Sequence, residues 1–273
     1  MILDGKQVAE KVFASLEARR KGIDRSITLG IAVCGGDATT ESFVRMKERV
    51  AERLNVHVRR VPVSPSATTE DMIFAVRALS DGTDTVVVQL PLPGRITSED
   101  ILSAIPKEKD VDALNPRISF DERTVHAPVA EAVDELLRAA GVSPEGKRAV
   151  VIGEGRLVGR PVADMLRAKG ADVSVVTLTS GSLEKLKDAD IVVSGAGFPS
   201  LIQPQMIKEG VVLIDAGTSE MNGAVVGDAD PACADVASVF TPVPGGVGPV
   251  MIAKLFENVL ALAEHEARGD AIA

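Results

Sequence analysis

A nine-residue stretch near the C-terminus, Thr241–Pro249, constrains the fold of this chain more than any other segment. It reads Thr-Pro-Val-Pro-Gly-Gly-Val-Gly-Pro, and prolines at this density cannot continue a helix or lie within a central strand. Glycine lets a backbone approach a ligand closely, whereas proline stiffens the backbone. The stretch therefore predicts a shaped loop that lines a ligand-binding site, with a helix following from about Met251.

The composition favours an α/β protein. A chain of 273 residues suits one large domain or two medium ones, and two domains are the better expectation. The chain has no Trp or Tyr and only 7 Phe, so its core is built from Val, Ile, Leu and Ala, which is typical of buried parallel strands. The net charge of -9 argues against nucleic acid or an anionic membrane surface as a partner.

The numbers of cysteines and histidines narrow the class of protein further. Cys34 and Cys233 lie far apart in the sequence, which predicts reduced thiols in a cytoplasmic protein. The chain has three histidines, His57, His126 and His265, and they offer no zinc-site or Ser-His-Asp constellation, so no metal is expected. No segment reaches the roughly 18 uncharged apolar residues of a membrane helix.

Hydrophobic patterns alternate between strand and helix twice along the chain. In the first part, strands are expected at 29–34, 56–63 and 85–89, with helices around 8–16, from an N-cap at Asp37 or Thr39 to about 54, and at 69–79. After an irregular segment the alternation restarts, with helices at 129–140 and 251–267 and strands at 148–153, 173–176, 191–194 and 211–215. Each part predicts a parallel sheet covered by helices, with a boundary near residue 120.

A glycine-rich turn follows the expected strand at 148–153. Gly153, Gly155 and Gly159 have the spacing G-x-G-x-x-x-G, one residue longer than the commonest dinucleotide fingerprint. Such a turn either presents N–H groups to a phosphate or simply connects a strand tightly to a helix. The next expected strand runs into Thr177 and Thr179 without the acidic residue that usually binds a ribose 2'-hydroxyl.

Several polar residues are candidates for chemistry in the first part. Phe43 and Lys47 lie four residues apart, hence on one helix face, although a lysine on a charged helix is more often a surface group. Gln89 ends a run of valines at the carboxyl end of a strand, where open α/β sheets bind ligands. Around Val111, one of Asp110 and Asp112 is expected to face a cleft and the other solvent or a helix end.

Four motifs in order resemble the bifunctional methylenetetrahydrofolate dehydrogenase/cyclohydrolase family, called FolD in bacteria. They are Ile-Leu-Asp-Gly-Lys at 2–6, Val-Gln-Leu-Pro-Leu-Pro at 88–93, Lys-Asp-Val-Asp at 109–112 and Pro-Gly-Gly-Val-Gly-Pro at 244–249, so the resemblance covers essentially the whole chain. It implies two α/β domains with a folate cleft between them. These are a catalytic domain of residues 1–120 plus 249–273, to which the C-terminal helix returns, and a Rossmann-like NAD(P)-binding domain of residues 121–248. It also implies a homodimer through the dinucleotide-binding domain.

The resemblance implies oxidation of 5,10-methylenetetrahydrofolate to the methenyl form with NADP, NAD being the alternative cofactor, and hydrolysis to 10-formyltetrahydrofolate. The residues it assigns fall into three sets: catalytic Lys47, Gln89 and Asp112; folate-binding Phe43, Leu90, Gly248 and Pro249; and cofactor-binding Gly153, Glu154, Gly155, Gly159, Thr179 and Thr218.

Three of the positions that depart from the family pattern bear on the two activities. Phe43 replaces a tyrosine near the lysine, Glu154 replaces the arginine that meets the NADP 2'-phosphate, and Thr179 stands where a basic residue is common. Two alternatives to the bifunctional enzyme therefore stay open. One is a cyclohydrolase with a lost dinucleotide site, and the other is a catalytically silent paralogue that binds folate.

Overall fold

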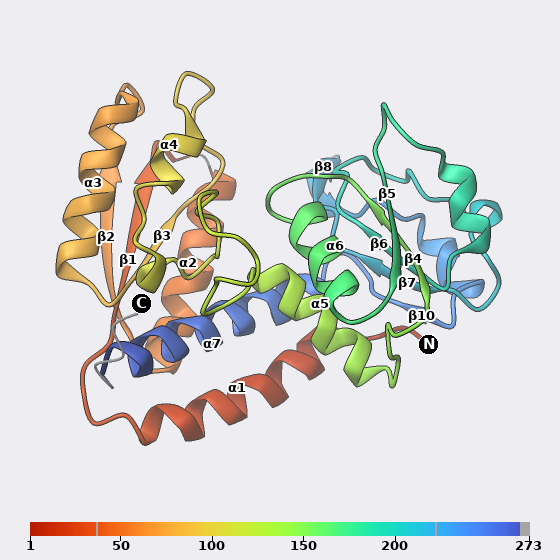
Figure 1. Ribbon diagram of the computed structural model, residues 1–273, viewed down its shortest axis with the longest axis horizontal. Coiled ribbons are helices and arrows are strands. Elements are labelled where there is room, and N and C mark those ends of the chain that lie inside the picture. Colours follow the sequence, from red (N-terminus) through yellow and green to blue (C-terminus); the bar gives the residue numbers. More distant parts are fainter. Residues whose placement is uncertain (37, 222, 268–273) are drawn as a thin grey trace. The chain divides into compact units, whose positions relative to one another are not determined.

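The computed structural model describes residues 1–36, 38–221 and 223–267, which divide into two compact units (Figure 1). One unit contains Phe13–Ala127 and the chain from Leu255 onward, and we call it the three-stranded unit. The other contains Met1–Val12 and Pro128–Lys254, and we call it the five-stranded unit. Helices α1 (Gly5–Lys21) and α7 (Val247–Ala267) each contribute residues to both units.

The three-stranded unit is built on a parallel sheet in the order β2-β1-β3. Its strands are β1 (Thr28–Cys34), β2 (His57–Val63) and β3 (Thr85–Val88), joined by α2 (Ala38–Arg53) and α3 (Thr69–Gly82). Helix α4 (Ser98–Leu102) and the 3-10 turn Lys107–Lys109 follow. Side chains of β1, β3, α3 and α4 share one apolar cluster, so these two helices cover one face of the sheet.

The five-stranded unit holds a parallel sheet in the order β10-β7-β6-β4-β5. Its strands are β4 (Arg148–Ile152), β5 (Asp172–Val176), β6 (Ile191–Ser194), β7 (Val212–Asp215) and β10 (Val239–Phe240). Helices α5 (Pro128–Ala139) and α6 (Gly159–Ala168) pack against each other, and 3-10 turns occur at Leu183–Asp188, Pro204–Met206 and Pro231–Asp235. An antiparallel hairpin of β8 (Ser219–Met221) and β9 (Ala224–Val226) forms a separate sheet.

The expected two-domain α/β architecture is confirmed, but the expected start of the last helix was wrong, and of the two N-caps expected for the second helix Thr39 is excluded. Helix α7 begins at Val247 rather than near Met251, so the Thr241–Pro249 stretch is a loop only in its first part. Pro249 is tolerated there because the first helical turn needs no donated N–H and favours the fixed φ of proline. Helix α2 begins at Ala38, which puts Thr39 inside the helix, and the alternative N-cap Asp37 lies outside the described residues.

The limits of the compact units differ from the domain limits expected from the sequence. The first twelve residues group with the five-stranded sheet because the Leu3 N–H donates to the Phe240 carbonyl at 2.8 Å and the Gly5 N–H donates to the Gly245 carbonyl at 3.0 Å. These pairings join residues more than two hundred positions apart, which no local pattern reveals.

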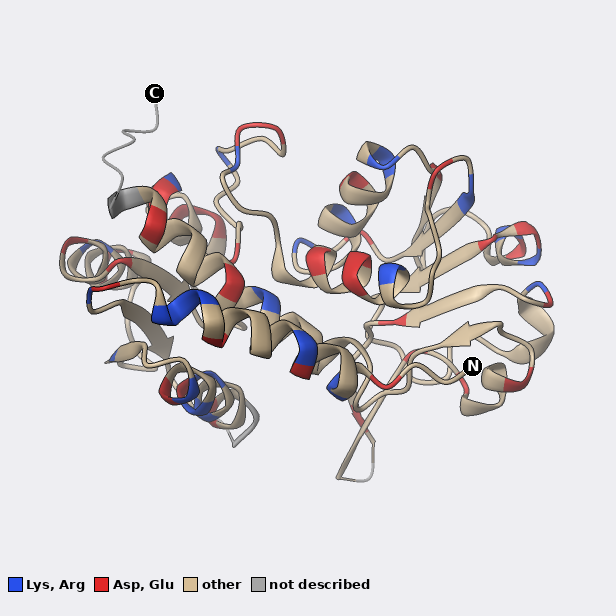
Figure 2. Cartoon of the chain, turned by 90° about the horizontal axis from the view of Figure 1, so that it is seen from below, with Lys and Arg blue, Asp and Glu red and all other residues tan. Residues whose placement is uncertain are grey.

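Positions of Lys and Arg and of Asp and Glu are both spread along the helices (Figure 2). On the two longest helices, Arg19 of α1 pairs with Glu264 of α7 at 2.7 Å within the three-stranded unit. In the described ranges, no helix is both long enough and apolar enough to cross a bilayer.

Candidate functional site

Lys47 and Gln89 form a buried polar pair in the three-stranded unit. Lys47 lies on α2 and Gln89 follows β3 at its carboxyl end, and their side chains are only 8% and 6% exposed. The Lys47 Nζ donates to Gln89 Oε1 at 2.8 Å, and Gln89 Nε2 donates to the Leu90 carbonyl at 2.6 Å. The second bond fixes the amide so that its oxygen faces the amine, and the pair therefore holds the amine without adding a charge.

Asp112 supplies an opposing charge to Lys47. Burial lowers the pKa of Lys47, and the Asp112 carboxylate counteracts that shift. Burial likewise raises the pKa of Asp112 to about 6, the Lys47 charge opposing and the Asp110 charge adding to this rise. The structure thus brings Lys47, Gln89 and Asp112 together at the carboxyl edge of one sheet, with an amine and a carboxyl both shifted toward neutral pH.

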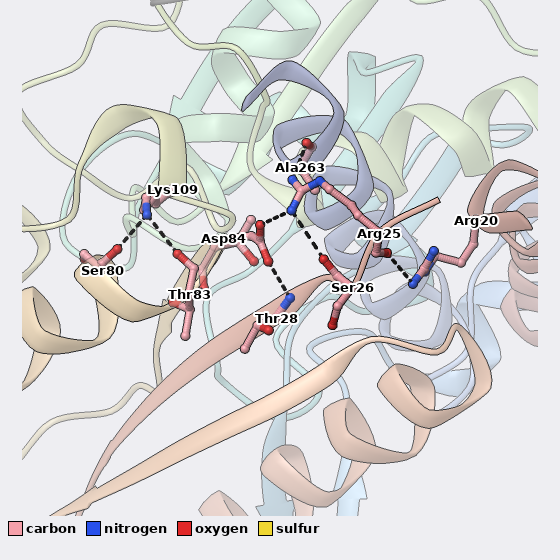
Figure 3. A network of polar contacts seen from close by, with 10 residues as sticks. Arg20, Arg25, Ser26, Thr28, Ser80, Thr83, Asp84, Lys109 and Ala263 are labelled. Atoms are coloured by element: carbon pink, nitrogen blue, oxygen red, sulfur yellow. Dashed lines mark hydrogen bonds and ion pairs between the residues drawn. The ribbon is translucent and has the colours of Figure 1, made fainter. Parts of the chain in front are cut away.

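The segment that carries Asp112 is fixed from several sides. Figure 3 shows the Lys109 Nζ between two backbone oxygens at the end of α3, those of Ser80 at 2.6 Å and Thr83 at 2.8 Å. A cation there complements the helix C-terminus. On the other side, Asn258 of α7 donates to the Val111 carbonyl at 2.9 Å.

Asp110 is not at the surface, contrary to the expectation that one aspartate of this motif faces solvent or a helix end. It is 2% exposed, it forms a parallel bridge with Val86, and its Oδ2 accepts the Asn115 N–H at 2.7 Å and an Arg123 N–H at 3.3 Å. Because the 109–112 segment pairs with a sheet strand, Asp110 points into the unit and serves its packing.

The predicted folate-binding residues fall in both units. Phe43 lies one turn before Lys47 on α2 and is half-buried, and Leu90 is half-buried directly after Gln89. Gly248 and Pro249 belong to the five-stranded unit, in the first turn of α7. A Cβ at Gly248 would meet no heavy atom within 4 Å, so packing does not explain this glycine.

The turn after β4 is closely packed and requires glycine at two of its positions. Gly153 has φ +100°, and a Cβ there would lie 2.8 Å from the Gly195 oxygen. A Cβ at Gly159 would lie 2.1 Å from the Gly153 oxygen, so both positions require glycine. Gly155 faces open space, and α6 begins without a side-chain cap. In its first turn the Arg160 N–H donates to the Gly155 carbonyl at 3.1 Å and Pro161 has no N–H, so the Gly159 N–H is the group able to meet an anion.

The end of β5 carries neutral hydroxyl groups instead of an acidic residue. Thr177 Oγ1 lies 2.7 Å from Ser180 Oγ and 3.3 Å from Thr179 Oγ1, in a turn closed by the Thr177 N–H to Ser180 carbonyl bond. These hydroxyls suit a ribose or its phosphate equally. Thr218 is exposed three residues beyond β7.

Sequence reasoning missed a basic side chain at the glycine-rich turn. Glu154 is exposed, and Arg160 reaches back along the turn so that its Nε donates to the Glu154 carbonyl at 3.1 Å. The signal in the sequence was the position of Arg160 in the first turn of the helix that follows the glycines. The helix dipole disfavours a basic residue there, because the N-terminal end of a helix is positive. The Arg160 guanidinium adds positive charge beside the backbone of Glu154.

Across the described ranges, no cluster of His, Cys, Asp and Glu has the grouping of a metal site. Cys34 and Cys233 are both buried free thiols.

The chain is similar to known proteins along its whole length. Residues 3–112 match the model of the tetrahydrofolate dehydrogenase/cyclohydrolase catalytic domain, and residues 127–267 match that of the NAD(P)-binding domain of the same family. The bifunctional protein FolD of Staphylococcus aureus (strain Newman) is 37% identical over 98% of each chain.

Two solved structures extend this similarity to the fold. The bifunctional enzyme FolD, methylenetetrahydrofolate dehydrogenase/cyclohydrolase, from Campylobacter jejuni superimposes with a TM-score of 0.92, at 31% identity, over 97% of this chain and 99% of that one. The Trypanosoma brucei methylenetetrahydrofolate dehydrogenase-cyclohydrolase complexed with NADP cofactor and inhibitor has a TM-score of 0.90, at 34% identity and 98% coverage of both chains.

Proposed function

Since this chain belongs to the tetrahydrofolate dehydrogenase/cyclohydrolase family, we infer that it catalyses two successive steps of one-carbon metabolism. It oxidises 5,10-methylenetetrahydrofolate to 5,10-methenyltetrahydrofolate with NADP, and it hydrolyses the methenyl form to 10-formyltetrahydrofolate. The observation that carries this inference is the buried Lys47–Gln89 pair beside Asp112, within the residues that match the family's catalytic domain.

Lys47 is proposed as the proton-transfer group of the hydrolysis. Water attacks the methenyl carbon and must lose a proton, and the ring nitrogen that leaves must gain one. An amine whose pKa burial has lowered exchanges protons near neutral pH far more readily than an exposed lysine does. Gln89 orients the amine through its Oε1 and cannot itself take the proton.

Asp112 is proposed to bind the pterin ring. Its carboxylate accepts two parallel N–H donors, which is the pattern that an amino-pyrimidine edge presents. Phe43, one helical turn before Lys47, and Leu90, next to Gln89, are half-buried apolar residues near the pair. Gly248 and Pro249 are the other members of the proposed folate-binding set.

NADP accepts the hydride from the methylene carbon when it is bound. We propose that Gly153, Gly155 and Gly159 hold its pyrophosphate at the start of α6. The remaining residues of the proposed cofactor set are Glu154 and Thr179 beside the adenosine ribose, and Thr218 beyond β7.

The first test of this function is a pair of assays on the purified protein. One follows methylenetetrahydrofolate oxidation with NADP or NAD, and the other follows the decay of methenyltetrahydrofolate without any dinucleotide. Activity in both supports the bifunctional enzyme. Hydrolysis alone would support the cyclohydrolase with a lost dinucleotide site, and the absence of both would support the silent paralogue. Similarity to bifunctional relatives over 98% of the chain favours neither alternative.

Phe43→Tyr should raise cyclohydrolase activity several-fold while dehydrogenase activity changes little. The added hydroxyl provides one hydrogen bond near the Lys47 amine, worth about 1 kcal/mol, and leaves the ring surface in place. The measurement is the ratio of the two activities in the variant and the parent. A parallel rise or fall of both would mean that this hydroxyl does not separate the two steps.

Glu154→Arg should shift the preference toward NADP over NAD by roughly tenfold, the factor that about 1.4 kcal/mol represents. The carboxylate of Glu154 repels the 2'-phosphate of NADP, which NAD lacks, so the parent should prefer NADP only weakly or prefer NAD. The readout is the ratio of kcat/KM for the two cofactors. An unchanged ratio would mean that Glu154 points away from the ribose.

Arg160 provides a matched comparison for that substitution. Its guanidinium lies beside the Glu154 carbonyl and adds positive charge to the same turn. Arg160→Gln should therefore lower the preference for NADP, opposite in sign to Glu154→Arg.

We propose that the protein acts in the cytoplasm as a homodimer formed by its dinucleotide-binding domain. The β8–β9 hairpin supports this interface because it exposes Met221 and Val225, each at 47%, on a small sheet of its own. The two free thiols fit a reducing compartment. A solution mass of two chains by light scattering supports the dimer, and a mass of one chain contradicts it.

A further inference from the structure

The loop that follows β6 donates three successive N–H groups to a single buried carboxylate. Asp228 Oδ2 accepts from Ala196 N at 2.7 Å and from Gly197 N at 3.3 Å, and its Oδ1 accepts from Phe198 N at 2.8 Å. Ser194 at the end of β6 adds its hydroxyl, which donates to Oδ2 at 2.6 Å. Asp228 is 0% exposed, so these four bonds replace its water shell.

The loop of residues 195–198 also packs against the glycine-rich turn. A Cβ on Gly153 would lie 2.8 Å from the Gly195 oxygen, and a Cβ on Gly195 would lie 2.4 Å from a methyl group of Val158. Strands β4 and β6 are paired neighbours, so the loop and the turn leave the same edge of the sheet. Any displacement of the loop therefore changes the backbone position of the turn.

The carboxylate itself has no freedom to move. A Cβ on Gly217 would lie 2.1 Å from the carboxyl carbon of Asp228, so the backbone after β7 packs directly on it. Asp215, at the end of β7, holds that backbone by accepting from Gly217 N at 2.9 Å and from Ala229 N at 2.8 Å. Asp228 is thus also packed against the backbone that follows β7.

We propose that Asp228 is a positioning residue for the NADP site. It does not touch the cofactor, and it acts by fixing the 195–198 loop, which in turn fixes the Gly153–Gly159 turn. Because the N–H groups of Ala196, Gly197 and Phe198 already donate to Asp228, the loop does not bind phosphate. The cofactor's phosphates are left to the turn and to the N-terminus of α6. This role rests on the proposed use of NADP.

The test is the dissociation constant of NADPH, measured by fluorescence, for the parent and for Asp228→Asn. The Asn amide presents N–H groups where the N–H groups of the loop need an acceptor, so at least one hydrogen bond to a charged group is lost. We expect the NADPH dissociation constant to rise at least tenfold as a result. Dehydrogenase kcat at saturating NADP should fall less than kcat/KM for NADP. Hydrolysis of methenyltetrahydrofolate, which uses no dinucleotide, should stay within about twofold of the parent.

Two further variants keep the test decisive. Ser194→Ala removes one donor and keeps the carboxylate, so NADPH binding should weaken by about twofold to tenfold. Asp230→Asn, a matched control two residues away that only caps the Ala232 N–H, should leave NADPH binding unchanged. If Asp228→Asn fails to fold, Ser194→Ala decides alone.

A folded Asp228→Asn or Ser194→Ala protein with the parental NADPH dissociation constant would overturn the positioning role. A parent protein that binds no NADPH but still hydrolyses methenyltetrahydrofolate would instead overturn the cofactor assignment, and the role of Asp228 with it.

Discussion

Lys47→Met should reduce hydrolysis of methenyltetrahydrofolate by about a hundredfold to ten-thousandfold, the usual contribution of a positioned acid-base group. Methionine has a similar length and an apolar character that suits a site only 8% exposed, so the variant should fold. The neighbouring Gln89 cannot replace the amine, because an amide does not titrate in the physiological range. The measurement is the rate of methenyl decay in the absence of dinucleotide.

The same variant should lose much less of its hydride transfer, because the cofactor supplies that chemistry. Arg49→Met is the matched control, since Arg49 is an exposed residue of the same helix whose Nε only contacts the Arg45 carbonyl. Both activities of the control should equal those of the parent. Full cyclohydrolase activity in Lys47→Met would remove Lys47 from the mechanism.

The elements that surround the site were predictable because each has a local signal. The run Thr85–Val88 is apolar and β-branched, so it forms a buried parallel strand, and the amide of Gln89 must then lie at its carboxyl end. The glycines after β4 likewise identify their turn, because φ +100° at Gly153 is open only to glycine. Periodicity placed Phe43 and Lys47 on one face of α2.

The features that the sequence did not predict depend on contacts between distant residues. The sequence pattern allows Asp110 to be a surface aspartate, but in the structure its bridge with Val86 accompanies a buried position. Lys47 is buried beside Gln89 at the end of β3 and near Asp112, residues far from it in the sequence. From the sequence alone it resembles an ordinary surface lysine. Asp228 shows the same limit, because its four donors come from residues thirty to thirty-four positions earlier in the chain.

Asp112→Asn should lower kcat/KM for methylenetetrahydrofolate at neutral pH by about tenfold to a hundredfold, because one acceptor for the paired pterin donors becomes a competing N–H group. Asp121→Asn, an exposed aspartate of the same unit, is the control and should leave kcat/KM unchanged. The pH dependence provides the more specific test of the same carboxylate.

Burial raises the pKa of Asp112 to about 6, so the carboxylate is protonated as the pH falls below that value. The protonated group accepts fewer hydrogen bonds, and kcat/KM of the parent should therefore fall on the acid side of about pH 6. This acid limb should vanish in Asp112→Asn. The part of the pH profile that depends on the titration of Lys47 should move to lower pH, because the Asp112 charge raises the pKa of Lys47 in the parent. An acid limb that persists unchanged in Asp112→Asn would belong to another group and would separate Asp112 from substrate binding.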